Sequence, residues 1–292
     1  AGNVARIGFA DGSTGQLAAG NAAMAARTGG SAFNAMRPGD IILVKPIGGD
    51  DYALRTIPGI SGGFIAENPH SGRVYAMQGG FDSRLSSFNR ATQAQRQPGS
   101  SVKPFVYAAA LDNGMTPASI IVDGSFCVYQ SATLGRKCFR NSGGGAAGPQ
   151  TMRWGLEQSR NLMTVRAANQ VGMDNVVRTM STMGIGDYDP YLAFALGAGE
   201  TTVAKLTNAY AMLVNHGRAL QPRLIDYVQD RNGRVIFPES WRPSAGCNAD
   251  DWDGRPMPRF QPNGRQLMDP MTAYQVVHML EGVVQRGTAQ VL

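Results

Sequence analysis

The chain has 292 residues, enough for one large domain or two unequal ones, and 43% of them are apolar, so it can bury a sizeable core. Its net charge is +6 and its pI is about 9.4, which permits an acidic polymer or a membrane surface as a partner. The arginines are scattered without a basic run, so we expect no nucleic-acid binding, and no apolar run reaches the roughly 18 residues that a membrane span needs.

Residues 1–58 have the composition of a small β domain. Strand-like segments cover residues 4–9, 40–44 and 52–57, and the turn signal Asp11-Gly12 follows the first of them. An alanine-rich stretch, residues 20–27, predicts a short helix. The pattern is typical of a small barrel or sandwich.

From residue 62 onward the pattern changes from strands to helices. A strand pair is predicted at residues 62–66 and 73–77, a helix at 101–111, and a loop-like region at 114–150. Further helices are predicted at residues 151–158, 162–171, 174–183, 200–215 and 270–285. A hairpin is predicted at residues 223–237, and residues 238–266, with five prolines, predict an irregular excursion.

The three cysteines, Cys127, Cys138 and Cys247, fit no zinc spacing. Cys127 and Cys138 flank a short loop-like segment, residues 128–137. They could form a disulfide in an oxidising compartment, where the bond would contribute about 2–3 kcal/mol, or they could be two free thiols. Spacing does not decide between the two.

Two common kinds of site are not supported by the sequence. The three histidines lie in a turn (His70), at a helix end (His216) and within an amphipathic helix (His278), and no Gly-x-Ser-x-Gly segment is present, so a Ser-His-Asp triad is not expected. No group of His, Cys, Asp or Glu has a recognised ligand spacing. We therefore expect no metal and no cofactor.

The residues that indicate chemistry are Ser100 and Lys103, at the start of the predicted helix. The chain has only four lysines, and a lysine can lose its proton when it is desolvated, whereas an arginine cannot. Residues i and i+3 share a helix face, so the amine could reach the hydroxyl and take its proton. Gly99 permits a sharp turn before Ser100, and Pro104 is tolerated in a first helical turn. By itself this spacing is also compatible with an ordinary surface pair.

A second motif, Ser159-Arg160-Asn161, follows 59 residues after Ser100, at the junction of two predicted helices. A hydroxyl and an amide on a tight turn can relay a proton and bind a substrate carbonyl. Ser87-Phe88-Asn89 matches the same pattern. The order and spacing favour the later copy, because penicillin-recognising serine enzymes have a Ser-x-x-Lys motif followed by a Ser-x-Asn motif about 60 residues later.

Longer segments around these motifs resemble the class A penicillin-binding proteins of the 1A type. The resemblance is carried by residues 89–112, 117–119, 155–161, 195–197 and 286–289. It implies an α+β fold, a penicillin-binding/β-lactamase-like transpeptidase domain with helices around an antiparallel sheet, over residues 59–292. It also implies that residues 1–58 are part of a small oligosaccharide/oligonucleotide-binding-like (OB-like) β domain.

The resemblance implies a serine-type D-Ala-D-Ala transpeptidase that cross-links the stem peptides of peptidoglycan. Ser100 would be the nucleophile and Lys103 the base. Ser159 would relay a proton to the leaving group, and Asn161 would hold the substrate's amide. β-Lactam antibiotics would acylate Ser100, and regulator proteins of the cell wall could be further partners.

One family motif is absent from the sequence. None of the four lysines begins the Lys-Thr/Ser-Gly motif that the family carries on an edge strand after a segment like Arg286-Gly287-Thr288-Ala289. The family's membrane anchor and glycosyltransferase domain are not in the sequence either. We therefore expect a fragment of an enzyme on the periplasmic side of the bacterial inner membrane. We also expect the fragment to lack a cation that would lower the pKa of Lys103, and to be nearly inactive alone.

Two other functions compete with this interpretation. A serine β-lactamase has the same first two motifs, but the β-rich leading segment and the excursion at residues 238–266 are against it, and no deacylating glutamate motif is recognisable. A degenerate domain that only binds cell-wall peptide is disfavoured because Ser100, Lys103, Ser159 and Asn161 are all present.

Overall fold

The structure, a computed structural model, describes residues 3–24, 29–133, 135–238, 254 and 264–291. The chain divides into two compact units, Ala1–Ser61 and Gly62–Leu292. The predicted excursion at residues 238–266 lies almost wholly outside the described residues, as does Cys247. The predicted boundary at residues 58/59 and the OB-like assignment of the first unit stay predictions.

The first unit is built on a four-stranded sheet in the order β1-β2-β4-β3. Its strands are β1 (Val4–Gly8), β2 (Thr14–Ala18), β3 (Leu43–Gly48) and β4 (Asp51–Arg55), joined by the short helices η1 (Ala19–Ala22) and α1 (Ala32–Ala35). β2 and β4 are parallel, and the other neighbours are antiparallel. Leu17, Ala22 and Leu54 form the buried centre. The sequence pattern did not predict β2 or α1, which are five and four residues long.

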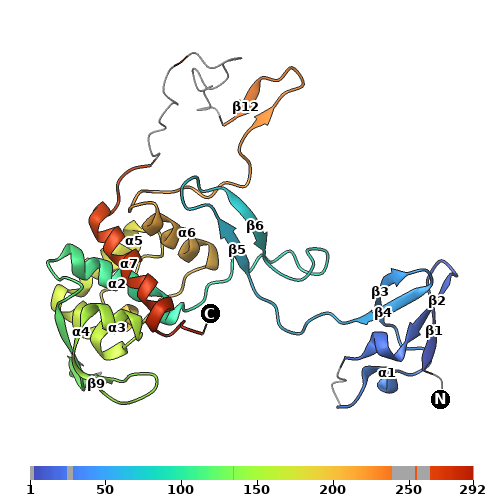
Figure 1. Cartoon of the computed structure of the whole chain (residues 1–292), viewed down its shortest axis with the longest axis horizontal. Coiled ribbons are helices and arrows are strands. Elements are labelled where there is room, and N and C mark those ends of the chain that lie inside the picture. Colours follow the sequence, from blue (N-terminus) through green and yellow to red (C-terminus); the bar gives the residue numbers. More distant parts are fainter. Residues whose placement is uncertain (1–2, 25–28, 134, 239–253, 255–263, 292) are drawn as a thin grey trace. The chain divides into compact units, whose positions relative to one another are not determined.

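In the second unit one helix, α2 (Lys103–Asp112), runs through the core, and every residue from Lys103 to Leu111 is buried. It packs against α3 (Met152–Glu157), α4 (Asn161–Val171), α5 (Met173–Thr182) and α7 (Pro270–Arg286) (Figure 1). A helix that is apolar all round belongs inside a domain. The side chains of Ala108, Ala109 and Ala110 are small, so that the neighbouring helices can approach α2 closely.

The remaining elements surround this helical core. α6 (Val203–Val214) packs against α7 and against β5 (Phe64–Glu67), which pairs with β6 (Val74–Gln78). The short helix η2 (Gly99–Val102) precedes α2, and η3 (Leu192–Leu196) contacts both η2 and α4. The strands that the structure describes in this unit form antiparallel pairs. The mixture of helices and strands confirms the predicted α+β class.

The prediction of a loop over residues 114–150 was wrong. Four strands lie there, namely β7 (Ile120–Asp123), β8 (Phe126–Ser131), β9 (Gly135–Phe139) and β10 (Gly148–Thr151). β7 pairs with β10 and β8 pairs with β9. These strands are four to six residues long. β9 and β10 are rich in glycine and polar residues, whereas β7 and β8 begin with short apolar runs (residues 120–122 and 126–129) that the loop prediction overlooked. Pairing with a partner strand, which periodicity does not report, makes them strands.

A disulfide joins β8 to β9. Cys127 and Cys138 are directly opposite each other in the register, and their sulfur atoms are bonded. Of the two alternatives that the sequence left open, the structure has the bonded one.

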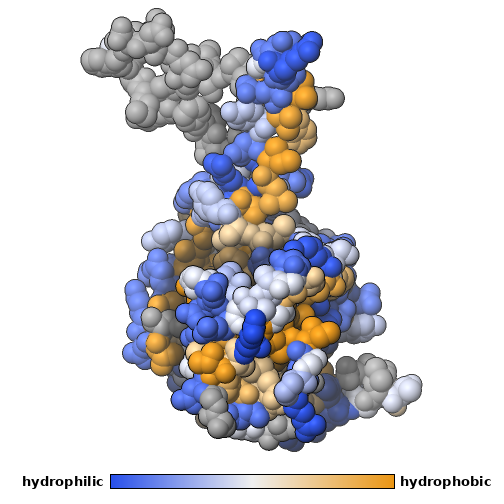
Figure 2. All heavy atoms as spheres, turned by 90° about the vertical axis from the view of Figure 1, so that its right-hand side faces the viewer, coloured by the Kyte–Doolittle hydropathy of each residue, from blue (hydrophilic) through white to orange (hydrophobic). Residues whose placement is uncertain are grey.

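The segment from Leu224 to Phe237 carries exposed apolar side chains, visible as orange spheres near the top of Figure 2. It includes β11 (Val228–Gln229) and β12 (Val235–Phe237), a small hairpin close to the one predicted. These side chains are not part of the buried cluster around α2. They therefore do not help to hold the site described below.

We expect the disulfide to stabilise the second unit. Replacing Cys127 and Cys138 together by serine should lower the free energy of unfolding by about 2–3 kcal/mol, because the bond closes a short loop in the unfolded chain. Chemical denaturation of the two forms measures this difference, with Cys247 kept in both. Unchanged stability, together with a wild-type chain in which all three cysteines react with a thiol reagent, would contradict the assignment.

Candidate active site

Ser100 lies in η2, one turn before the buried part of α2. Gly99 has a left-handed backbone with φ of 57°, which turns the chain just before Ser100. Its N–H donates to the carbonyl oxygen of Gly197 at 3.3 Å, and a Cβ at Gly197 would collide with the Gly99 backbone. The Tyr210 hydroxyl donates to the Ser101 carbonyl oxygen at 2.9 Å. The turn is thus held from two sides, while Ser100 itself is exposed.

Lys103 begins α2 and is only 1% exposed. Its amine donates to three oxygen atoms of the second motif. They are the Ser159 carbonyl oxygen at 2.6 Å, the Ser159 Oγ at 3.1 Å and the Asn161 Oδ1 at 2.7 Å. An ammonium group has three N–H donors, so this set satisfies it completely. The two motifs of the sequence therefore form one site, joined through the lysine.

The Ser159-Arg160-Asn161 turn connects α3 to α4 in a conformation that serine seldom adopts. Ser159 has φ of 51°, in the left-handed region, which costs about 1–3 kcal/mol for a residue with a side chain. Its N–H donates to the Leu156 carbonyl oxygen and that of Arg160 to the Gly155 carbonyl oxygen, each at 2.9 Å. In this conformation both the carbonyl oxygen and the hydroxyl of Ser159 face the Lys103 amine.

Two contacts lie next to the turn that connects α3 to α4. A Cβ at Gly155 would lie 2.8 Å from Met163 Cε, so a larger residue there would require the end of the Met163 side chain to shift. Asn161 Nδ2 donates to the Arg140 carbonyl oxygen at 3.0 Å, which leaves Oδ1 for Lys103. The residue after β9 thereby sets the orientation of the Asn161 amide.

The C-terminal end of α7, around Arg286, holds the C-terminal end of α3. Glu157, which is 3% exposed, forms a two-pronged ion pair with Arg286, at 2.6 Å to Nη2 and 3.0 Å to Nε. The Thr288 N–H donates to the Glu157 carbonyl oxygen at 3.2 Å, and Gln158 Nε2 donates to the Arg286 carbonyl oxygen at 3.1 Å. The end of α7 thus fixes the residues that lead into Ser159.

The surroundings of Lys103 lower its pKa to about 8. Burial is the larger cause, because it disfavours the charged form, and the nearby charge of Arg160 is the second. At neutral pH about a tenth of the amines would be neutral, far more than for an exposed lysine. The cation that we expected to be missing is that of the Lys-Thr/Ser-Gly motif, and this expectation stays a prediction. Arg160, the middle residue of the second motif, is a cation beside Lys103 that we did not predict.

We predicted that Ser100, Lys103, Ser159 and Asn161 belong to one site, with a direct contact between the first two. Among the described residues no hydrogen bond joins the Ser100 hydroxyl to the Lys103 amine, since the amine turns toward Ser159 and Asn161. The roles of Arg160 and of the Arg140 carbonyl were missed. A basic residue between the Ser and Asn of the motif was the one signal that could have indicated Arg160.

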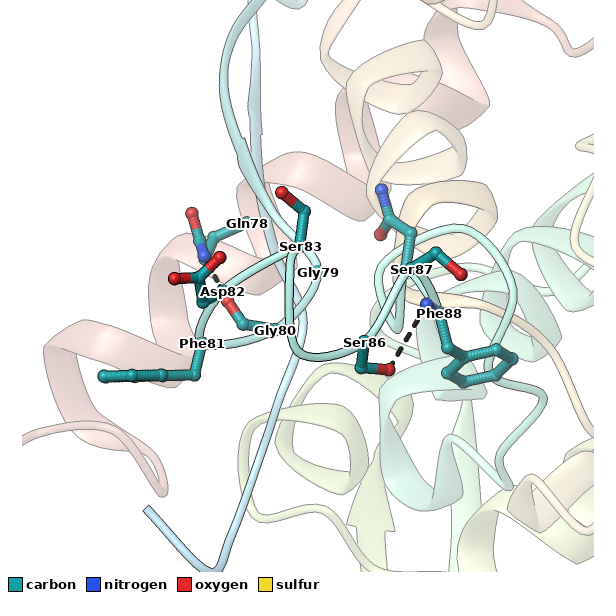
Figure 3. A pocket seen from close by; sticks show the side chains of 10 residues that line it. Gln78, Gly79, Gly80, Phe81, Asp82, Ser83, Ser86, Ser87 and Phe88 are labelled. Atoms are coloured by element: carbon teal, nitrogen blue, oxygen red, sulfur yellow. Dashed lines mark hydrogen bonds between the residues drawn. The ribbon is translucent and has the colours of Figure 1, made fainter. Parts of the chain in front are cut away.

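The other Ser-x-Asn match, Ser87-Phe88-Asn89, lies in a loop that borders a separate cavity of about 430 Å³ (Figure 3). Asn89 serves the loop itself, because its Oδ1 accepts the N–H of Ala91 at 3.0 Å. No lysine lines this cavity. Its acid, Asp82, is paired with Arg84 at 2.6 Å, and hydrogen bonds from Arg84 lower the pKa of Asp82 to about 2. This copy of the motif therefore has no base beside it.

A cavity of about 520 Å³ opens beside the Gly99 turn. β9 and the segment that follows contribute Lys137, Cys138, Phe139 and Arg140, and η3 and its C-terminal end contribute Ala193, Leu196, Gly197 and Ala198. Its lining includes two bases and no carboxylate.

No helix among the described residues is long and apolar enough to cross a membrane. The same residues contain no group of three His, Cys, Asp or Glu side chains that could hold a metal ion.

Comparison with known proteins connects this geometry to a family. Residues 62–292 match the family described as the penicillin-binding protein transpeptidase domain. Penicillin-binding protein 1A of Rickettsia bellii is 39% identical over 289 residues, which are 98% of this chain and 36% of the relative. Penicillin-binding protein 1A of Neisseria gonorrhoeae is 33% identical over 87% of this chain and 30% of its own length. The chain thus spans about a third of each of these relatives.

Solved structures agree with the sequence relatives. The crystal structure of penicillin-binding protein 1A from Haemophilus influenzae has a TM-score of 0.74 and is 27% identical, covering 98% of this chain and 46% of that one. PonA1 of Mycobacterium tuberculosis in complex with penicillin V has a TM-score of 0.61 at 22% identity over 76% of this chain and 55% of its own, which shows a shared fold. The chain therefore belongs to the penicillin-binding protein transpeptidase family, of the 1A type.

Proposed function

We propose that this chain is the transpeptidase part of a longer peptidoglycan-synthesising enzyme, acting on stem peptides that end in D-Ala-D-Ala. The observation that carries the proposal is the buried Lys103 amine, held by Ser159 and Asn161 one turn after the exposed Ser100. A lysine with a pKa of about 8 suits general-base work near neutral pH.

In the first half-reaction Ser100 Oγ attacks the carbonyl carbon of the D-Ala-D-Ala peptide bond, and its proton passes to the neutral Lys103 amine. The C–N bond then breaks, and the leaving nitrogen takes a proton from Lys103 by way of the Ser159 hydroxyl. The products are an ester on Ser100 and free D-Ala. In the second half-reaction an amine of another stem peptide attacks the carbonyl carbon of this ester and loses a proton to Lys103 by way of Ser159. A new peptide bond forms, the bond from this carbon to Ser100 Oγ breaks, and Ser100 Oγ takes a proton back from Lys103.

The hydrogen bonds of Lys103 define how the amine becomes a base. With all three protons it donates to three oxygens, and with two it keeps two bonds and gains a lone pair. The two shorter bonds, to the Ser159 carbonyl and the Asn161 Oδ1, hold the amine in place. The longer one, at 3.1 Å to Ser159 Oγ, is the bond that is lost, so that the lone pair can take the proton of Ser100, and it forms again when the amine is protonated. The proton relay then runs along this bond.

The whole protein would lie on the periplasmic side of the bacterial inner membrane, with a membrane anchor and a glycosyltransferase domain outside this chain. The longer relatives and the disulfide support this proposal, because disulfides persist in oxidising compartments. β-Lactams would acylate Ser100 and leave slowly. Regulator proteins of the cell wall are further proposed partners.

Ser100→Ala should abolish labelling of the full-length protein by a fluorescent penicillin, because no other residue of the proposed mechanism forms the ester. Ser101→Ala is the matched control and should label normally, since the contacts of Ser101 in the adjacent turn are made by its backbone N–H and carbonyl. Labelling is measured on denaturing gels. Normal labelling of the Ser100 variant would overturn the covalent mechanism, and rapid loss of the label from the wild type would favour a β-lactamase.

The acylation rate should rise with pH through about 8. Below this pKa Lys103 carries a proton and cannot act as base, and above it the amine is neutral. Time courses of penicillin labelling from pH 6 to 10 measure the profile. Lys103→Arg should be inactive at every pH, because arginine keeps its proton. A flat profile between pH 6 and 9 would contradict the role of Lys103.

The 292-residue chain alone should be acylated about 10²–10³-fold more slowly than the full-length protein. The sequence contains no Lys-Thr/Ser-Gly motif, whose strand supplies half of the oxyanion hole in this family. Both proteins are labelled in parallel after their thermal unfolding shows that they are folded. Equal rates would show that the segment is not needed.

A further inference from the structure

Asp123, at the end of β7, is a buried acid that the proposed mechanism leaves without a role. Its carboxylate is fully buried and accepts three hydrogen bonds. Oδ2 accepts from Arg160 Nε at 2.8 Å and from the Ala147 N–H at 3.0 Å, and Oδ1 accepts from Asn141 Nδ2 at 2.8 Å. Oδ2 also forms an ion pair with Arg160 Nη2 at 2.7 Å. Burial raises the pKa of Asp123, but the bonds from Asn141 and Arg160 outweigh it, so the acid stays charged.

Both side-chain partners of Asp123 reach the Ser159–Asn161 turn. Arg160 is the middle residue of that turn. Asn141 Oδ1 accepts the N–H of Leu162 at 3.2 Å, in the first turn of α4. One carboxylate therefore holds the chain on both sides of Asn161, whose Oδ1 in turn holds Lys103 at 2.7 Å.

The turn needs such support because it is strained and carries a charge. Ser159 has a left-handed backbone, which persists only when neighbouring contacts impose it. The Arg160 guanidinium is only about a fifth exposed, so without a counter-charge it would be costly to keep beside the site. It also donates to the Gly145 carbonyl oxygen at 3.2 Å.

We propose that Asp123 is a positioning residue for acylation, which acts through Arg160 and Asn141 to hold the Ser159–Asn161 turn against the Lys103 amine and to balance the charge beside it. The proposal rests on the proposed function, since it concerns the same reaction. Asp123 touches neither Ser100 nor the amine. It acts through the backbone of the turn and through the net charge that Arg160 presents.

Two causes lower the pKa of Lys103, and they are first its burial and second the charge of Arg160. Tyr107 on α2 itself is neutral, because burial raises its pKa. The remaining titratable or charged groups on the elements that pack against α2 are Arg153 and Glu157 on α3, Arg166 on α4, Asp174 and Arg178 on α5, and Tyr274, His278, Glu281 and Arg286 on α7.

The test measures the rate of penicillin acylation of the full-length protein against pH for three variants. Asp123→Asn should be about 10- to 100-fold slower, as expected when a reacting group is displaced by about 1 Å. Its rate should begin to rise at lower pH than in the wild type, because the unbalanced Arg160 charge disfavours the charged form of Lys103. Arg160→Gln should also be slower, but its rise should move to higher pH, because it removes the cation and leaves the Asp123 carboxylate.

Asn141→Ser separates positioning from charge. It breaks the link to Leu162 and keeps the ion pair, so the rate should fall while the pH of the rise stays the same. Asp112→Asn is the matched control, the same chemical change at the far end of α2, where Asp112 bonds Thr272. It should leave the rate and the profile unchanged. Thermal unfolding checks that each variant folds, and the Arg160 and Asn141 variants still test the proposal if Asp123→Asn does not fold.

Opposite pH shifts for Asp123→Asn and Arg160→Gln would support the proposal, because a purely structural role would slow both without moving the profiles apart. Wild-type rates and profiles in these two variants, or shifts in the same direction, would overturn it. If Ser100→Ala still labels, the proposed function fails. If Ser100→Ala does not label while the Asp123, Arg160 and Asn141 variants label like the wild type, only this inference fails.

Discussion

The site depends on the burial of one amine. Lys103 is almost completely removed from water, and its cost is offset by three oxygen acceptors from a single turn. Two of those acceptors belong to Ser159 and the third to Asn161, so the lysine requires the turn in its strained form, and the turn requires the lysine. Much of the surrounding architecture, from the glycine at the α3–α4 junction to the Glu157–Arg286 pair, keeps these two partners together.

Charge is arranged around this amine in layers. The first layer is neutral oxygen, the second is the Arg160 guanidinium and the third is the Asp123 carboxylate behind it. Oxygen acceptors alone would stabilise the ammonium form. The desolvated position and the nearby cation act the other way and bring the pKa of Lys103 to about 8. The balance between these effects leaves a base that can change its protonation state under physiological conditions.

The sequence predicted the parts of this molecule whose signals are local. Pro270 and the spacing of apolar residues up to Val284 predicted α7, and Gly99 with Pro104 predicted the start of the helix that carries Lys103. The spacing of Ser100 and Ser159 indicated that the two motifs belong to one site, but the contact expected between Ser100 and Lys103 is replaced by contacts of Lys103 with Ser159 and Asn161. The strands at residues 120–151 were not predictable in the same way, because each is defined by a partner elsewhere in the chain. Asp123 and Arg160 are 37 residues apart, and neither a motif nor a period relates them.

The left-handed backbone of Ser159 places two requirements on this position, a residue that tolerates a positive φ and a side chain that carries a hydroxyl. The carbonyl that binds Lys103 can come from any amino acid that tolerates a positive φ, such as glycine or asparagine, whereas the hydroxyl that relays the proton can come only from serine or threonine. Threonine is β-branched and is penalised in this conformation. Serine is thus the residue that meets both demands at moderate cost, so natural variation at this position should be narrow even where the neighbouring sequence drifts.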